Sequence, residues 1–299
     1  CFHFARPQPA SEDTDVNGEM TSLLSKLSVD GNLPALVRRL KSIDKPRIVC
    51  CVGAGISVSA GIPDFRSPGT GLYDNLQKYD LPYPEAVFDV DYFRQKPKAF
   101  LTLAKEMWPG IRYQPTFAHR AMKALHDKGY LQRIYTQNID TLERVAGVPG
   151  DKLVEAHGSF SGASCINCRA ANTTEWVRDQ IMADQEPRCA CGGLVKPNIV
   201  FFGENLPSLF FDAQSEDFGF MRGPDLMVIA GTSLQVQPFA SLQNAGSCPR
   251  ILINREIPET FRKTAEDVVL LGDSDDGFAA LAAALGLEVP PAGGAAAKL

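Results

Sequence analysis

Six short, continuous apolar runs recur along the chain, separated by longer stretches of helical or mixed character. They cover residues 47–52, 131–135, 199–202, 226–230, 251–253 and 268–271. Because these runs lack the alternation of a half-exposed strand, they predict strands that are buried on both faces, as in a parallel sheet. The alternation of such strands with helices predicts an α/β fold with a doubly wound, Rossmann-like parallel sheet.

Apolar residues at a helical period predict the first and last helices of this fold. The first helix is marked by Val29, Leu33, Leu36, Val37 and Leu40. The last begins near Asp276 and buries Phe278, Leu281 and Leu285. Residues 1–28 and 289–299 show no such period, and we expect both to be flexible tails.

Two stretches interrupt the alternation of strands and helices. Residues 66–115 are rich in Pro, Tyr and Phe, and residues 160–197 contain four clustered cysteines. We interpret them as a helical module and a zinc-ribbon module of a smaller lobe. The large domain then consists of residues 29–65, 116–159 and 198–288. Because ligands of open α/β sheets bind at the carboxyl ends of the strands, a lobe inserted there is expected to roof the binding site.

Charge and composition argue against several classes of function. The 299 residues include 30 Lys and Arg against 35 Asp and Glu, a net charge of −5, which argues against direct nucleic-acid binding through a basic surface. No apolar run is long enough for a membrane span. Residues 1–28 resemble neither a signal peptide nor a transit peptide. We expect a cytoplasmic protein, with the nucleus as a further compartment; mitochondria stay open because the chain begins at Cys1 rather than Met.

Four of the eight cysteines lie close together as two pairs. They are Cys165 with Cys168, and Cys189 with Cys191. Four thiolates are the ligand set of a closed tetrahedral zinc site, so we predict a structural Zn²⁺ ion here. Four unligated thiols or two disulfides are the alternatives, and the second pair has a shorter spacing than is usual for a zinc knuckle.

Polar clusters follow three of the predicted strands. They are Gly53-Ala54-Gly55-Ile56-Ser57, Gly231-Thr232-Ser233 and Asn254-Arg255-Glu256. Glycines after a strand let backbone N–H groups approach a pyrophosphate, and Asn254 and Glu256 suit ribose hydroxyls. Val58 stands where a dinucleotide fingerprint has its third glycine, so the first cluster matches that motif only in part. Each of the three clusters, taken alone, also fits a plain turn. Three clusters at one sheet edge favour a nucleotide site.

One more strand end carries candidate catalytic chemistry. Residues 136–140, with the sequence Thr-Gln-Asn-Ile-Asp, follow a predicted strand, and His157 comes soon after, beside Gly158. A buried imidazole with a near-neutral pKa suits general-base catalysis. A structural role for His157 is the alternative, and the residues alone do not decide. We expect His119 to be structural and His126 to lie on a helix surface.

Together these motifs resemble the sirtuin family of NAD-dependent protein deacylases. The resemblance covers residues 29–288 and is strongest at residues 53–57, 61–66, 135–140, 155–158 and 196–204 and at the four clustered cysteines. Residues 71–73, 80–86, 141–144 and 235–238 are similar to the class of the family that contains sirtuins 2 and 3.

The resemblance implies roles for particular residues. Those implied to bind NAD are Gly53, Ala54, Gly55, Ser57, Asp64, Phe65, Arg66, Tyr73, Gln137, Asn138, Asp140, Gly231, Thr232, Ser233, Asn254, Arg255, Glu256 and Ser274. Those implied to bind the acyl-lysine peptide are Val200, Phe201, Gly203, Glu204, Leu234 and Val236, with Val200 and Phe201 lining a tunnel. Zinc is implied on Cys165, Cys168, Cys189 and Cys191.

The implied reaction removes acetyl and other uncharged acyl groups from protein lysines and yields nicotinamide and O-acyl-ADP-ribose. His157 is the implied base, with Asn138 and Asp140 as its catalytic neighbours. Asp74 and Asn75 follow Tyr73, where acid-accepting relatives carry a basic residue, so we expect acetyl-lysine to be preferred over succinyl-lysine. The implied partners are acyl-lysine proteins such as histones or tubulin-like substrates.

Two other functions compete with this interpretation. Mono-ADP-ribosyl transfer to a protein shares the step that cleaves NAD, and a non-catalytic scaffold would bind NAD or acyl-lysine without reaction. One departure from the family pattern concerns Asn198, which stands where relatives often carry Asp. We expect it to change peptide or loop affinity slightly and to leave catalysis intact.

Overall fold

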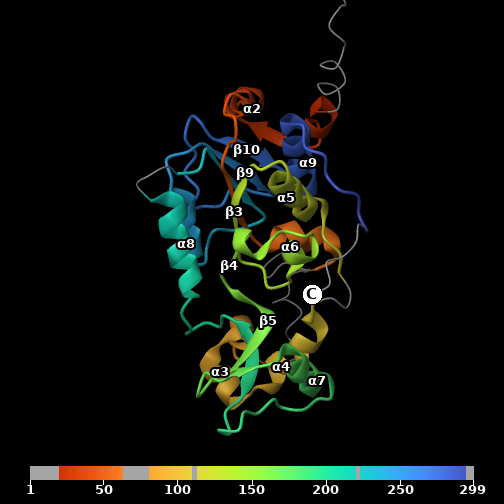
Figure 1. Ribbon diagram of the computed structural model, residues 1–299, viewed down its shortest axis with the longest axis vertical. Coiled ribbons are helices and arrows are strands. Elements are labelled where there is room, and N and C mark those ends of the chain that lie inside the picture. The colour runs from red at the N-terminus through yellow and green to blue at the C-terminus, as the bar shows by residue number, and fades with distance from the viewer. Residues whose placement is uncertain (1–19, 63–80, 110–112, 220–222, 294–299) are drawn as a thin grey trace, which may run out of the picture.

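The computed structural model describes residues 20–62, 81–109, 113–219 and 223–293, which form a large and a small lobe. Figure 1 shows the large lobe in the upper part of the molecule and β5 leading down into the small lobe. The residues expected in the loop over NAD, Asp64, Phe65, Arg66 and Tyr73, lie outside the described residues, as do the outer parts of both predicted tails.

Within the described chain, the large lobe contains a seven-stranded sheet with the order β1-β10-β9-β8-β2-β3-β4. Its strands are β1 (Ser28–Asp30), β2 (Ile48–Val52), β3 (Leu131–Thr136), β4 (Leu153–Glu155), β8 (Leu226–Ala230), β9 (Arg250–Asn254) and β10 (Val268–Leu271). Every neighbouring pair is parallel except β1 with β10. Five of the six predicted runs are strands of this sheet, and the predicted α/β, Rossmann-like fold is confirmed.

The strand order determines where a ligand should bind. From β2 the chain moves outward to β3 and β4, and it then returns to the other side of β2 to add β8, β9 and β10. The order therefore reverses between β2 and β8. In open α/β sheets, ligands bind at such a reversal, outside the carboxyl ends of the strands. The turns at Gly53 and Gly231 directly follow these two strands.

Helices cover both faces of the large sheet. One face packs against α2 (Leu33–Lys41), α5 (Phe117–Asp127) and α9 (Ser274–Leu285), and the other against α8 (Ser208–Phe218) and η5 (Phe239–Asn244). Figure 1 shows α8 apart from α5 and α9, across the sheet. Because successive strand residues point to opposite faces, Cys50 belongs to the first core and Cys51 to the second. Shorter connections are η1 (Ala54–Ala60), α6 (Leu142–Val145) and η4 (Gly150–Lys152).

The small lobe combines a three-stranded antiparallel sheet with helices. Its elements are β5 (Gly158–Cys165), β6 (Ala171–Asn172), β7 (Val195–Ile199), η3 (Pro84–Phe88), α3 (Val90–Gln95), α4 (Lys98–Met107) and α7 (Thr174–Met182). Phe88, Phe93, Phe100 and Phe201 meet edge to face in its core, with ring centroids 4.7–6.1 Å apart. Such aromatic pairs stabilise a small core beyond the area that they bury.

The structure corrects the prediction for the start of the chain. The first predicted helix begins only at Leu33, after the Asn32 side chain accepts a hydrogen bond from Ala35 N (2.9 Å). Val29 instead lies in edge strand β1, opposite Leu270. Its position fitted the helical period, but pairing with β10 prevails over that local pattern. Residues 20–24 are helical and Leu27 is buried, so the flexible tail expected through residue 28 is wrong for this inner part.

The apolar run at 199–202 is the other correction. It was expected to be a parallel strand of the large sheet, but β7 ends at Ile199 and pairs antiparallel with β5 in the small lobe. The last predicted helix is confirmed as α9, with Phe278, Leu281 and Leu285 buried. None of the described helices is both long and apolar enough to cross a membrane.

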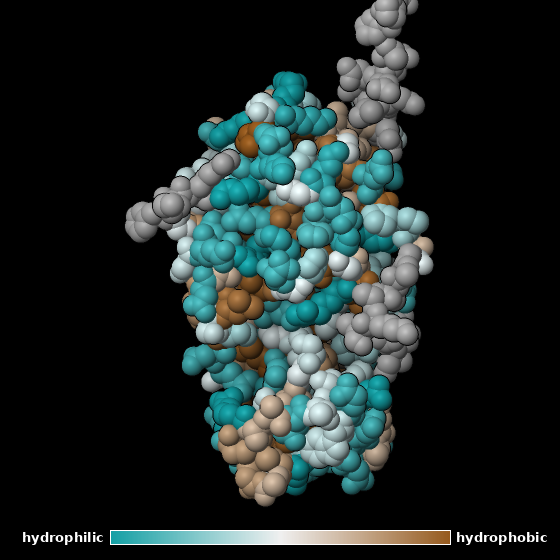
Figure 2. Space-filling model, in the orientation of Figure 1, coloured by the Kyte–Doolittle hydropathy of each residue, from teal (hydrophilic) through white to brown (hydrophobic). Residues whose placement is uncertain are grey.

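The surface in Figure 2 is mostly hydrophilic, with a hydrophobic patch beside the lower end of α8, at the level where the lobes meet. Leu209 and Phe211 of this helix are among the large apolar residues that the described chain exposes, with exposed fractions of 52% and 47%. The molecule therefore presents apolar surface next to the junction at which the candidate site lies.

Candidate active site

The four clustered cysteines converge in the small lobe. Sulfur–sulfur distances are 3.5 Å for Cys165 and Cys191, 3.6 Å for Cys168 and Cys189, and 3.4 Å for Cys168 and Cys191. A disulfide requires about 2.05 Å, whereas four thiolates about 2.3 Å from a Zn²⁺ ion lie nearly 4 Å apart. All four sulfurs lie within 4.8 Å of one another, so the residues fit a structural zinc ion.

The turn after β2 is held against the end of β8 by main-chain contacts. Gly53 N donates to Ala230 O (3.0 Å), and Gly55 N donates to Gly231 O (2.8 Å). A Cβ atom on Gly55 would lie 2.6 Å from the Gly231 Cα, so this approach requires glycine. The two glycine N–H groups thus have protein acceptors. The turn is suited to a pyrophosphate because it brings the main chain around Ala54 to the sheet edge.

Three polar side chains form one network at this edge. Ser57 Oγ donates to Asp140 Oδ2 (2.6 Å). Asn138 Nδ2 lies 3.3 Å from Ser57 Oγ and 3.2 Å from Gly53 O. Asn138 and Ser57 are buried, and Asp140 also accepts from Leu142 N (2.9 Å). The structure therefore brings together the predicted residues from the ends of β2 and β3 in one fixed arrangement.

A second network joins β3 to β8 and β9. Gln137 Nε2 donates to Thr232 Oγ1 (3.1 Å), which also accepts from Leu234 N (3.2 Å). Asn254 Nδ2 donates to Thr232 O (3.2 Å) and to Glu256 O (2.9 Å). The three polar clusters predicted at strand ends are therefore neighbours in space, which supports a single elongated nucleotide site over three independent turns.

The far end of this edge is more open. Ser233, Arg255 and Glu256 are exposed. Arg255 pairs with Asp273 at 3.3 Å, and both side chains are exposed. Ser274 is the first residue of α9, which packs against β9 through Gly277 and Ile253. These predicted residues follow the carboxyl ends of β8, β9 and β10.

His157 lies at the junction of the two lobes, between β4 and β5. Its Nδ1 lies 3.0 Å from Gln137 O, and its own carbonyl accepts from Val200 N (2.8 Å). Burial lowers the pKa of His157 below its usual value, and the bond to the Gln137 carbonyl opposes this only in part. Because a carbonyl oxygen can only accept, Nδ1 carries the proton and Nε2 keeps its lone pair.

Sequence reasoning missed a buried polar cluster behind Asp140. Ligating atoms of His119, Asp140 and Glu143 lie within 4.8 Å of one another. Among the described residues, His119 Nε2, Thr141 Oγ1 and Glu143 Oε1 are buried atoms without a hydrogen-bond partner. Burial, with Asp140 nearby, raises the pKa of Glu143 to about 8, so this carboxyl is neutral at pH 7. Two carboxylates three residues apart, Asp140 and Glu143, were the available signal.

His119 also has the structural role expected of it. Its Nδ1 lies 2.7 Å from Thr116 Oγ1 and forms part of the cap of α5. Burial lowers the pKa of His119. A neutral ring at this position closes the back of the network around Asp140 without adding a charge.

Of the two residues expected to line the acyl-lysine tunnel, Val200 and Phe201, the structure buries Phe201 in the small lobe. Phe201 is only 1% exposed and belongs to the core of the small lobe. Phe202 is 43% exposed, and its main chain bonds to Phe88 O and Val90 N. Alternate residues of an extended segment face opposite ways, so Val200 and Phe202 face away from the core that Phe201 enters.

The two predicted peptide-binding segments, residues 203–204 and 234–236, differ in exposure and in main-chain hydrogen bonding. Gly203 is exposed with a φ of 89°, and the Glu204 carboxylate accepts from Phe201 N (2.9 Å). Leu234 is buried, its N–H donates to Thr232 Oγ1 and its carbonyl accepts from Thr260 Oγ1 (3.2 Å). The carbonyl of the partly buried Val236 likewise accepts from Ala240 N (2.9 Å), so both predicted residues of this segment already make main-chain bonds within the chain.

Comparison with known proteins identifies the family. Residues 53–238 match the Sir2 family, and this segment contains the turn after β2, the Asn138 network, His157 and the four cysteines. The chain belongs to the Sir2 family. The sirtuin resemblance inferred from the motifs is thereby confirmed, and the match spans both lobes.

Relatives within the Sir2 family are similar over most of the chain. The NAD-dependent protein deacetylase sirtuin-2 of Danio rerio is 49% identical over 286 residues, which cover 88% of this chain and 73% of that protein. The NAD-dependent protein deacetylase sirtuin-3 of Mus musculus is 52% identical, with 80% and 72% covered. The NAD-dependent protein deacetylase hst2 of Schizosaccharomyces pombe is 51% identical, with the same shares covered.

Proposed function

We propose that this chain removes acetyl groups from protein lysines in a reaction that consumes NAD. The observation that carries the proposal is the position of His157, whose Nδ1 is bonded to the carbonyl of Gln137, the residue next to Asn138 of the Ser57–Asn138–Asp140 network. Ser57 of that network follows β2, next to the point where the strand order of the sheet reverses. The activity named for relatives at about 50% identity agrees with this geometry.

His157 is suited to act as a general base. Its lowered pKa keeps the ring neutral at pH 7, and the Gln137 carbonyl fixes the tautomer in which Nε2 accepts a proton. The proton is expected to come from a ribose hydroxyl, whose oxygen then attacks the activated acyl group. General-base assistance of this kind contributes roughly 10²–10⁴-fold to a rate.

The residues around His157 bind and orient. Gln137, Asn138 and Asp140 are held by the network, so they meet the nicotinamide ribose and carboxamide with little loss of side-chain freedom. When bound, NAD supplies the ribosyl group that accepts the acyl group, and nicotinamide is its leaving group. Zinc on Cys165, Cys168, Cys189 and Cys191 has a structural role, since four sulfur ligands leave no position for water.

The proposal extends to the kind of protein that carries the acyl-lysine. Histones or tubulin-like proteins with accessible acyl-lysines fit an extended peptide laid against Gly203 and Val236. A cytoplasmic location, with the nucleus as a second compartment, stays a prediction that imaging of the tagged protein tests. Comparing acetylated histone and tubulin peptides in one assay separates these substrates.

Replacement of His157 by Ala tests the proposed function. With an acetyl-lysine peptide and NAD, we expect a loss of about 10²-fold or more in deacetylated peptide measured by mass spectrometry, with zinc content and fold unchanged. His126→Ala, on the outer side of α5, is the matched control and should keep normal turnover. Near-normal turnover by the His157 variant would remove this residue from the base role. Label from NAD that ends on the protein would indicate ADP-ribosyl transfer instead.

A further inference from the structure

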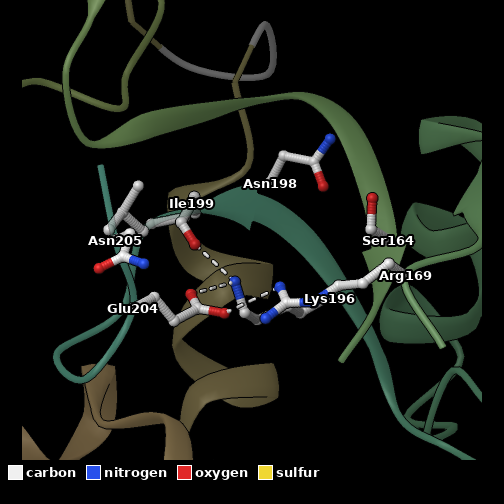
Figure 3. A pocket seen from close by; sticks show the side chains of 8 residues that line it. Ser164, Arg169, Lys196, Asn198, Ile199, Glu204 and Asn205 are labelled. Atoms are coloured by element: carbon white, nitrogen blue, oxygen red, sulfur yellow. Dashed lines mark hydrogen bonds and ion pairs between the residues drawn. The ribbon is translucent and has the colours of Figure 1, made fainter. Parts of the chain in front are cut away.

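A polar cavity of about 270 Å³ lies beside β7 and residues 200–205, which follow this strand. Figure 3 shows its polar side chains: Ser164, Arg169, Lys196, Asn198, Glu204 and Asn205. Ser164 of β5 lies directly opposite Lys196 of β7 in the small sheet. None of the proposed catalytic residues His157, Asn138 and Asp140 lines this cavity.

The cavity is tied to the reaction site by the main chain. Ile199 and Val200 line it, and Val200 N donates to the carbonyl of His157 (2.8 Å). Glu204 also lines it and follows Gly203, which faces the expected path of the peptide. A peptide that presents its acyl-lysine to His157 therefore passes the rim of the cavity. This placement rests on the proposed function.

Lys196 and Glu204 cancel one another in charge. Lys196 is 5% exposed, and its Nζ lies 2.9 Å from Glu204 Oε2 and 4.3 Å from the centroid of the Phe201 ring. Lys196 Nζ also donates to Ile199 O (2.5 Å). This buried pair is neutral overall whichever partner holds the proton, so it contributes no net charge.

Arg169 supplies the excess charge. Its guanidinium lies 3.7 Å from Glu204 Oε1, with the side chain 74% exposed, and Figure 3 shows it approaching the same carboxylate as Lys196. Glu204 is the one carboxylate among the residues that line the cavity, and the other polar groups are the neutral side chains of Ser164, Asn198 and Asn205. The cavity therefore has a net charge of about +1 and several neutral hydrogen-bonding groups.

We propose that this cavity is a specificity subsite for an acidic side chain of the substrate, namely a Glu or Asp carboxylate near the acyl-lysine. A single carboxylate balances the charge of Arg169, whereas a phosphate would leave a negative excess. Asn198 is exposed at the cavity and offers an amide that can donate a hydrogen bond. An aspartate at this position would cancel the positive charge and repel the substrate carboxylate.

Acetyl-lysine peptides that carry either Glu or Gln at each flanking position test the subsite. At one position we expect the Glu peptide to have a kcat/KM about two- to fivefold higher, as for an exposed ion pair, with the effect in KM and weaker at high salt. The ratio of the two peptides is compared within each variant, so general losses of activity cancel. Arg169→Gln should bring the ratio to one, and Asn198→Asp should bring it to one or below.

Arg188→Gln is the matched control, because this exposed arginine of the same module pairs with Glu186 and does not line the cavity. It should keep the ratio. Equal turnover of both peptides at every position, or a preference that persists in Arg169→Gln, would overturn the proposal. A preference for phosphoserine without one for Glu would overturn the carboxylate assignment.

Fluorescence anisotropy of the same peptides separates the failure of this proposal from the failure of the proposed function. If no peptide is turned over, the deacetylase function fails, and the ratio of dissociation constants for the Glu and Gln peptides still tests the subsite. The proposal expects the same two- to fivefold preference in binding, and equal binding of the two peptides overturns it.

Discussion

The two lobes fix their functional groups by different means. In the large lobe, the polar residues at the strand ends are held by main-chain contacts between the ends of β2 and β8 and by a short hydrogen bond from Ser57 to Asp140. In the small lobe, the described sheet has three strands, and four cysteine sulfurs and a cluster of phenylalanines provide much of the cohesion. The NAD side of the site should therefore be robust, whereas the peptide side should depend on zinc.

The largest expected effect breaks the joint between the lobes. Gly158 has a φ of 68°, and a Cβ there would lie 1.9 Å from the carbonyl oxygen of Asn198. Gly158→Ala should lower the free energy of unfolding by roughly 3–5 kcal/mol and abolish deacetylation, because the main chain beside His157 must move. Chemical denaturation and turnover of an acetylated peptide measure the two effects.

Gly129→Ala is the control for the conformational part of that effect. Gly129 has a φ of 77° and no atom within 4 Å of the added Cβ. The cost of Gly129→Ala therefore comes from the left-handed backbone conformation alone. We expect a loss of only about 1–2 kcal/mol and normal turnover. Equal losses for the two variants would show that the contact with Asn198 is unimportant.

Loss of zinc should loosen the small lobe and leave the large lobe unchanged. Cys165→Ser removes one of four sulfur ligands, so bound zinc should fall from about one ion per chain toward none. Amide hydrogen exchange should then increase in β5, β6 and β7 and stay slow in β2, β8 and β9. Cys248→Ser, outside the cluster, should change neither measurement. Full zinc loss without faster exchange in the small lobe would contradict a structural role for the metal.

The last expected effect appears only as a change of stability with pH and concerns Glu143 in the large lobe, whose pKa is raised from 4.5 to about 8. Between these pH values the unfolded chain releases this proton and the folded chain keeps it, so stability falls as pH rises. Glu143→Gln removes the titration, and its stability relative to the natural protein should increase from pH 5 to pH 8. The limit is about 1.4 kcal/mol per pH unit.

Thermal unfolding at several pH values measures this difference. Glu259→Gln, an exposed change of the same type, is the matched control. A constant difference between Glu143→Gln and the natural protein across this range would show that Glu143 is ionised in the folded state.

Much of the fold could be predicted from local pattern, and the exceptions have physical causes. The runs that became β2, β3, β8, β9 and β10 were recognised because burial on both faces demands continuous apolar sequence. Strand β4 has three residues, too few for a periodic signal. The run at 199–202 has the pattern of a strand in the large sheet, but its buried members Ile199 and Phe201 lie in the core of the small lobe.

The candidate site shows a similar division. Its motif residues were found through family resemblance, while the cluster of His119, Asp140 and Glu143 comes from segments that only packing brings together. The burial of Phe201 beside the exposed Phe202 also followed from the fold. Phe201 packs against Phe88 and Phe100, which precede it by about a hundred residues.

The sequence by itself determined the α/β class, the zinc ligands and the family, because apolar periodicity, cysteine spacing and motif order are properties of short segments. Only the tertiary structure decided which acceptors the glycine N–H groups bond, which carboxyl is neutral and which charged side chains meet in the cavity. Those properties depend on desolvation and on distances between segments remote in the chain, and no local pattern encodes them.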